Sequence, residues 1–176
     1  VMTKIFRAPR GNNALELLAE IFGGSTTSRL YKELVVNKKL AIEAGADYSP
    51  LSLNDTSLSL YVTPAPGVTV TQLEGALNQM VRDLVTKGIT LEELNAAKSR
   101  KIASYTYYRD SLQGPALLFG KALSSGFDIS YLEDWSDDID RISIDDINKA
   151  AIDVFKGDNL PVTGLLLTTD KKEAQP

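Results

Sequence analysis

Three segments of the sequence carry residue types that could do chemistry, and the first is rich in glycine and hydroxyl groups. Residues 23–28 read GGSTTS, which superficially matches a phosphate-binding loop. The segment lacks the Gly-Lys-Ser/Thr ending of such a loop, and it follows a helical pattern where a phosphate loop would follow a strand. We therefore interpret it as the end of one helix joined to the start of the next.

The second segment mixes basic and aromatic side chains between residues 98 and 109. Such a mixture can form a nucleic-acid surface. The whole chain, however, has 19 Lys and Arg against 23 Asp and Glu, a formal charge of −4. We therefore expect a solvated helix face with half-buried tyrosine rings, and no nucleic-acid partner. The residues are Lys98, Arg100, Lys101, Tyr105, Tyr107, Tyr108 and Arg109.

The third segment, residues 134–146, is the most acidic. It lacks the Asp-x-Asp-x-Asp-Gly spacing and closing Glu of an EF-hand. A loose divalent-cation site is one interpretation. The favoured one places the carboxylates at two helix starts, where the helix dipole stabilises negative charge. The residues are Asp134, Asp137, Asp138, Asp140, Asp145 and Asp146.

The sequence contains neither histidine nor cysteine. Zinc, copper and non-haem iron sites take most of their ligands from these two residue types. Serine and cysteine nucleophiles usually need an imidazole as base. The chain alone therefore offers no transition-metal site, catalytic triad, thiol nucleophile or disulfide, and its residues alone indicate an α+β domain without chemistry of its own.

Hydrophobic periodicity predicts the elements that position these segments. Four runs are expected as strands, with Ile42, Ala44, Ala46 and Tyr48 on the inner face of the second and the last one buried. Capping boxes are expected at Thr69/Gln72, Thr90/Glu93 and Ser130/Glu133. The predicted strands are residues 1–7, 42–48, 58–62 and 162–167, and the predicted helices include residues 15–22, 25–34, 69–87, 91–108, 115–124 and 143–155.

These elements predict one α+β domain, with a mostly antiparallel sheet and helices packed on one face. We expect the domain to span residues 1–168 and residues 169–176 to form a flexible tail. No apolar run approaches the roughly 20 residues that span a bilayer. The chain begins directly with a strand pattern, and we expect it to be a piece of a longer protein.

Residues 17–41 carry a family resemblance. LLAEIFGG at residues 17–24, SRLYKEL at 28–34 and KLA at 39–41 resemble the C-terminal domain of the pitrilysin-type zinc peptidases. This family includes insulin-degrading enzyme (insulinase) and mitochondrial processing peptidase. The similarity continues in order through residues 55–67, 88–98 and 162–166.

The resemblance implies the family's tandem α/β sandwich, in which two halves or subunits enclose a peptide chamber. The family's zinc lies on an inverted His-x-x-Glu-His helix in the N-terminal half, where the Glu is the general base. A chain without histidine cannot be that half. The resemblance therefore implies a non-catalytic companion domain that closes the chamber and helps bind peptide, with zinc in a missing N-terminal half and no hydrolysis by this chain alone.

Some family members grip the substrate with an Arg and a Tyr in this companion region. The matching positions here are Val35 and Ile42. Their side chains have no charge and no hydrogen-bond donor, so they cannot bind the substrate in that way. Two-component bacterial members place zinc in one subunit and the Arg–Tyr pair in the other. The resemblance thus implies the zinc-bearing subunit of the bacterial type, with an Arg–Tyr subunit and a peptide substrate as partners, and it favours export to the periplasm.

Other expectations remain open. The chain could be an inactive homologue that acts as a scaffold or assembly subunit, or an unrelated α+β binding module. Because a domain separated from its partner exposes apolar surface, a homodimer of the fragment through residues 23–34 is also expected. The candidate residues lining the chamber are Arg29, Tyr31, Tyr107, Tyr108 and Arg109.

Overall fold

The computed structural model describes residues 1–156 and 160–167, and the expected tail at residues 169–176 lies outside them. The element order confirms the predicted strand–helix–helix–strand–strand start, the run of helices and the final strand. The strands are β1 (Met2–Ala8), β2 (Ala41–Tyr48), β3 (Thr56–Pro64) and β4 (Val162–Leu165). The helices are α1 (Asn13–Gly23), η1 (Tyr31–Asn37), α2 (Val70–Lys87), α3 (Leu91–Asp110), α4 (Gly114–Ser124), α5 (Ile129–Glu133), α6 (Trp135–Arg141) and α7 (Ile144–Phe155).

The four strands form one antiparallel sheet in the order β2-β3-β1-β4. On its inner face, Phe6 pairs with Leu58 and Met2 pairs with Val62. All four of these side chains are buried. Lys4 lies on the same face, where its ammonium group reaches Glu74 of α2 at 2.8 Å, so the charge is paired within the packed layer.

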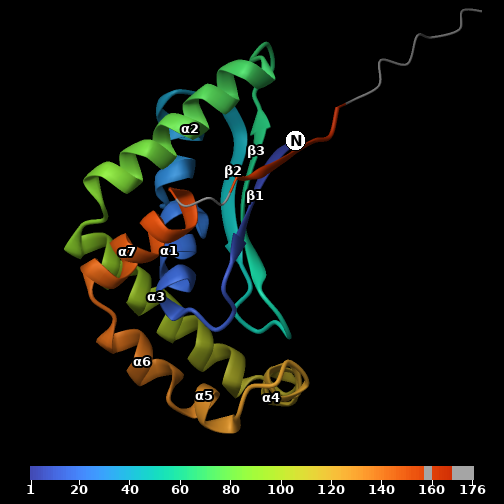
Figure 1. Cartoon of the computed structure of the whole chain (residues 1–176), viewed down its shortest axis with the longest axis vertical. Helices are drawn as coiled ribbons and strands as arrows, with labels where there is room; N and C mark the ends of the chain where they lie inside the picture. Colours follow the sequence, from blue (N-terminus) through green and yellow to red (C-terminus); the bar gives the residue numbers. More distant parts are fainter. Residues whose placement is uncertain (157–159, 168–176) are drawn as a thin grey trace, which may run out of the picture.

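Helices cover one face of this sheet, as predicted. Figure 1 shows α1, α2, α3 and α7 on the same side of the strands, while α4 lies beyond their lower end. The core between the layers includes Leu15 and Leu18 of α1, and Ile147 of α7. Among the described residues, no helix combines the length and apolar character needed to cross a membrane.

Two of the three predicted capping boxes are present. Thr69 with Gln72 begins α2, and Thr90 with Glu93 begins α3. The prediction at Ser130 was wrong, because α5 begins after Asp128 and no side chain caps it. A third box instead begins α7, where Ser143 and Asp146 exchange hydrogen bonds.

The acidic segment supplies carboxylates to helix starts, as favoured from the sequence. Asp137 and Asp138 lie in the first turn of α6, and Asp145 and Asp146 lie in the first turn of α7. Hydrogen bonds from the Ser143 side chain and backbone lower the pKa of the Asp146 carboxyl. The helix α6 itself was not predicted, because it is short and separated from α5 only by Asp134.

The prediction that the last strand is buried was wrong. β4 is an edge strand that pairs with β1 alone, and each of its four residues is exposed. The apolar run continues through Leu166 and Leu167, which are also exposed. Apolar composition predicted burial here, but only the position of the strand within the sheet decides which residues are covered.

Candidate functional site

The connection between η1 and β2 is the most irregular part of the described backbone. η1 is a seven-residue π-helix. Lys39 then has a φ of 52°, a left-handed value that non-glycine residues rarely adopt. The first pairs of β2 with β3 contain a β-bulge between Ala41 and Glu43. Irregularities of the π-helix and β-bulge kinds occur often at functional sites. We call residues 31–43 the irregular segment.

Local hydrogen bonds fix the wide helical turn. The Lys38 backbone N–H donates to the Glu33 carbonyl at 2.9 Å, which is the i to i−5 bond of a π-helix. The Glu33 carboxylate also accepts from Asn37 at 3.0 Å and lies 3.2 Å from the Lys38 ammonium. The hydrogen bond from Asn37, followed by that from Lys38, lowers the pKa of Glu33. Leu34 is buried and anchors the turn to the core.

The bulge reverses the expected orientation of Ile42. The sequence predicted this side chain on the inner face, but it is 60% exposed. Ala41 pairs with Pro64 and Glu43 pairs with Thr63, so Ile42 is an extra residue in β2 with no partner in this register. The extra residue interrupts the alternation of inward and outward side chains, so Ile42 is exposed while Ala41 and Ala44 are buried. The prediction for Ile42 was wrong, and the sequence carried no signal for the extra residue.

Both family Arg–Tyr positions therefore lie in the irregular segment. Val35 is half-buried and packs against the core, while its neighbour Val36 is 55% exposed. These side chains have no donor, acceptor or charge, so they can contact a ligand only by apolar packing. Val35, Val36 and Ile42 therefore offer apolar contact area beside and on the edge strand β2, next to the charged Glu33–Lys38 pair.

The side chains of this chain do not include the histidine ligands of the family's zinc. The sequence has no histidine or cysteine. Within residues 1–156 and 160–167, no group of three or more potential ligand side chains is placed to hold a metal ion. The two histidine ligands of the family's zinc motif are therefore not supplied by this chain.

Helix α1 holds β2 in place by an unusually close approach. A Cβ atom added at Gly23 would overlap the backbone nitrogen of Ala46 and would lie 2.5 Å from the Gly45 carbonyl carbon. Gly45 in turn lies under the ring of Tyr61, which packs on it from β3. From the sequence, Gly23 was predicted only to end a helix. Its packing role became visible once α1 and β2 were placed together.

Arg29 and Tyr31 lie at the start of η1. The Arg29 guanidinium is engaged within the domain, because it donates to Glu93 of α3 at 2.5 and 2.6 Å and to the Gly88 carbonyl at 2.9 Å. Tyr31 is half-buried and begins the irregular segment.

The other three predicted chamber residues lie at the far end of α3. Tyr107 is 79% exposed, Tyr108 is exposed, and the Arg109 guanidinium lies 5.7 Å from the Tyr105 ring centroid. Helical rise places Tyr107 roughly 21 Å along α3 from Glu93, the partner of Arg29. The structure therefore divides the five predicted residues into two separate groups.

Fold and site together define an α+β domain with an irregular segment beside one edge of its sheet. A family model described as the peptidase M16 inactive domain matches residues 6–101, more than half of the chain. The chain therefore belongs to the M16 peptidase family, as an inactive domain, and the predicted relationship to zinc peptidases is confirmed. A comparison with curated proteins gives no match.

Solved structures confirm the fold. The inactive peptidase domain of a proposed zinc protease from Bordetella parapertussis has a TM-score of 0.87 and 21% identity, with 99% of this chain and 94% of that chain covered. A protease from Helicobacter pylori has a TM-score of 0.84 and 22% identity, with 92% and 40% covered. The periplasmic protease PqqL from Escherichia coli has a TM-score of 0.71 and 21% identity, with 96% and 19% covered. The chain thus spans less than half the length of the last two proteins.

Proposed function

We propose that this chain is the non-catalytic companion domain of a zinc-dependent metalloendopeptidase and closes one wall of its peptide chamber. The observation that carries the proposal is a peptidase-family match on a chain without histidine. Zinc and the general-base Glu would belong to an N-terminal half of the same protein. The Arg–Tyr pair would belong to a second family subunit.

We further propose that the irregular segment contacts the peptide. Val36 and Ile42 are exposed apolar side chains. Val36 follows Val35, which occupies the family's Arg position, and Ile42 occupies the family's Tyr position. Apolar packing there would supply contact area without a charged grip. Of the predicted chamber residues, Arg29 and Tyr31 would support this wall, and Tyr107, Tyr108 and Arg109 would lie on a separate part of it.

Reconstitution tests the proposal. Hydrolysis of a fluorogenic peptide is measured with the zinc-bearing half and the Arg–Tyr subunit, with and without this chain. We expect the chain alone to be inactive even with added zinc, and to raise the activity of the other components. Chelator-sensitive hydrolysis by the purified chain would overturn the proposal. An unchanged rate together with stable complex formation would support the scaffold alternative.

The peptide contact is tested separately in the reconstituted enzyme. Ile42→Asp places a charge on the proposed apolar wall, so we expect KM for an apolar peptide to rise about tenfold while kcat changes little. Ile129→Asp is the matched control, because Ile129 is also an exposed isoleucine but lies on α5. Equal KM values for the two variants would contradict a peptide contact at Ile42.

Two proposals concern the setting of the domain. The periplasmic assignment of the structurally similar PqqL supports export of this chain, which fractionation of the source cells tests directly.

The homodimer through residues 23–34 is tested by sedimentation of the isolated chain. A strict monomer at high concentration would contradict it.

A further inference from the structure

The strand β4 is the less protected of the two edges of the sheet. It pairs with β1 alone, and the side chains of Val162 and Leu165 are each more than half exposed. The apolar run continues into Leu166 and Leu167, which are also more than half exposed. Figure 1 shows β4, in red, beside the start of β1, with its far end pointing away from the helices.

The opposite edge strand, β2, carries features that protect an edge from other chains. Glu43 and Asp47 place charges on it, a β-bulge interrupts it, and α1 approaches it closely at Gly23. By contrast, the β4 strand Val162–Leu165 contains no charged residue and no proline, and its register with β1 has no shift. An edge strand without such protection is a template for pairing with another chain.

The free edge of β4 presents the backbone groups of Thr163 and Leu165. The Leu166 N–H donates to the Val1 carbonyl at 2.8 Å, and the Leu166 carbonyl accepts from the Val1 amino group at 2.9 Å. Successive residues of an antiparallel pair direct their N–H and C=O groups to opposite sides. Those of Leu165 and Thr163 therefore face away from β1, and no described residue pairs with β4 on that side. An extended strand is the partner that fits this row of donors and acceptors.

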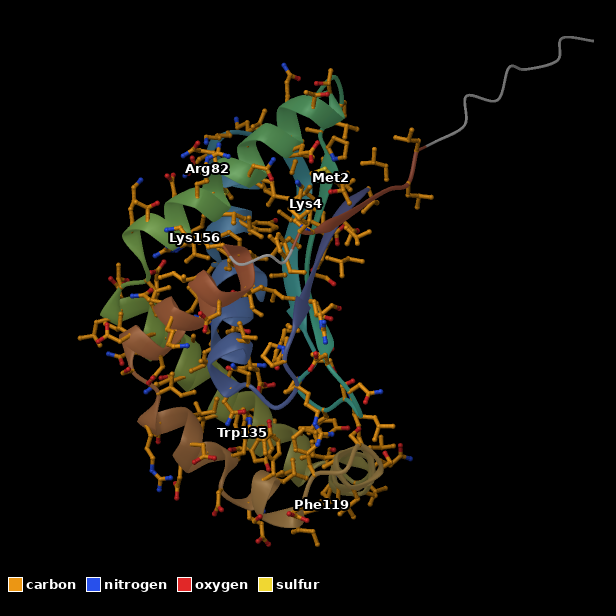
Figure 2. All side chains as sticks on the ribbon, viewed as in Figure 1. Met2, Lys4, Arg82, Phe119, Trp135 and Lys156 are labelled. Atoms are coloured by element: carbon orange, nitrogen blue, oxygen red, sulfur yellow. The ribbon has the colours of Figure 1, made fainter. Side chains whose placement is uncertain are left out.

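The apolar side chains of β4 lie on both faces of the sheet. Met2, which Figure 2 labels, is buried on the inner face and pairs with Leu165. Because successive side chains of a strand alternate, Leu165 lies on the inner face, and Val162, Gly164 and Leu166 lie on the outer face. A strand added at this edge would therefore cover apolar area on both faces.

Gly164, in the middle of this run, is not required by the fold of the chain itself. Its φ lies outside the left-handed region, and its pairing with Thr3 is regular. A Cβ atom added at Gly164 would meet nothing within 4 Å. A glycine inside a strand often marks a place where another backbone approaches closely.

We propose that β4 pairs with β4 of a second copy of this chain, antiparallel about a two-fold axis at Gly164. In this register Thr163 lies opposite Leu165 of the second copy, and the reverse, so the free backbone groups of both residues are paired. Val162 lies opposite Leu166 on the outer face, so exposed apolar side chains cover each other. The strand is thus complementary to itself, and because it has no charge, the symmetry brings no like charges together within it.

The contact between two β4 strands is small, so we expect weak association. Two short strands cover much less than the roughly 800 Å² per partner of a standard interface. We therefore expect a dissociation constant of about 10–100 μM. The contact uses residues other than 23–34, and it does not depend on the proposed peptidase function.

A single introduced cysteine tests the register, because the sequence contains none. Residues that face each other without exchanging hydrogen bonds have Cα atoms about 4.5 Å apart, a distance that a disulfide can bridge. With oxidised glutathione as the oxidant, Gly164→Cys should form a disulfide-linked dimer. Thr163→Cys is the matched control, because its two Cα atoms would be about 8 Å apart, too far for a disulfide. Equal cross-linking of the two variants, or none by Gly164→Cys, would overturn the proposal.

Sedimentation equilibrium measures the association without a cross-link. Leu166→Lys places a charge opposite Val162 of the second copy and should raise the dissociation constant at least tenfold. Leu117→Lys, at an exposed leucine of α4, is the matched control and should dimerise like the wild type. Circular dichroism verifies that each variant folds.

A third variant separates this dimer from one through residues 23–34. Thr26→Lys changes an exposed residue of that range and should leave association unchanged. Association lost in Thr26→Lys but kept in Leu166→Lys would assign the dimer to residues 23–34 and overturn the proposal. A wild-type chain that stays monomeric at about 500 μM would also overturn it.

Discussion

Arg29 and Glu93 form a two-point ion pair across 64 residues of sequence, with Nε to Oε1 at 2.5 Å and Nη2 to Oε2 at 2.6 Å. The Glu93 carboxylate also accepts from the Thr90 backbone N–H at 2.8 Å, which closes the capping box of α3. A single carboxylate therefore fixes the start of α3 and joins it to Arg29, two residues before the irregular segment. Parallel, charge-assisted bonds of this kind are directional as well as strong.

Glu93→Gln tests the ion pair without removing the cap, because Gln also closes a capping box. We expect a loss of about 1–2 kcal/mol in the free energy of unfolding at neutral pH, since both partners are partly solvent-exposed. Urea denaturation measures this loss. Glu92→Gln, at an exposed neighbouring position, should change stability by no more than about 0.5 kcal/mol.

The Arg29–Glu93 ion pair also predicts how the free energy of unfolding changes at acidic pH. Burial raises the pKa of Glu93, but hydrogen bonds from Arg29 and Thr90 outweigh burial, so its folded-state pKa is lowered. The stabilisation is therefore present above the unfolded-state pKa of about 4.3 and is lost as pH falls through the folded-state value. Between about pH 5 and pH 3 the wild type should lose more stability than Glu93→Gln. Parallel pH curves would contradict this.

Gly23→Ala tests the contact between α1 and β2. The added methyl group meets the backbone of Gly45 and Ala46, which cannot move aside as a side-chain end could. We expect a destabilisation of about 3 kcal/mol, measured by denaturant unfolding. In contrast, a Cβ at Gly75 of α2 meets nothing within 4 Å, so Gly75→Ala should stabilise the protein by roughly 0.5–1 kcal/mol. A Gly23→Ala variant as stable as the wild type would refute the close approach.

Ile42→Asp and Ala44→Asp test the β-bulge. Ala44 is 6% exposed, so a carboxylate there would be buried and should cost about 3 kcal/mol or more. The side chain of Ile42 is exposed, and Ile42→Asp should cost no more than about 1 kcal/mol. Thermal unfolding of the two variants gives the comparison. Similar, large losses in both would indicate regular alternation along β2 in place of a bulge.

Periodicity and caps were enough to predict most of the elements. Leu58, Leu60 and Val62 alternate and are buried as expected, because the period of a strand is a local property. The boxes at Thr69 and Thr90 formed for the same reason, since each uses groups only three residues apart. The box expected at Ser130 did not form, because the N-cap residue of α5 is Asp128, two residues earlier.

The candidate sites were much less predictable. The sequence grouped Arg29 with Tyr107 as chamber residues, yet the length of α3 separates their surroundings. A cavity of about 210 Å³ lined by α3, α5 and α6 depends on contacts such as Trp135 with Glu16, which are 119 residues apart. No local pattern encodes a contact of that range, so the sequence could not place these side chains around a common space.

Residue types alone determined what this protein lacks, because a chain without histidine or cysteine has no donor set for the family's zinc. The order of strands and helices was likewise determined by local periodicity. Only the tertiary structure decided that Ile42 points outward and that β4 is exposed, because both depend on how strands pair. It also decided that four aromatic rings meet in one cavity, since that requires helices distant in sequence to pack against one another.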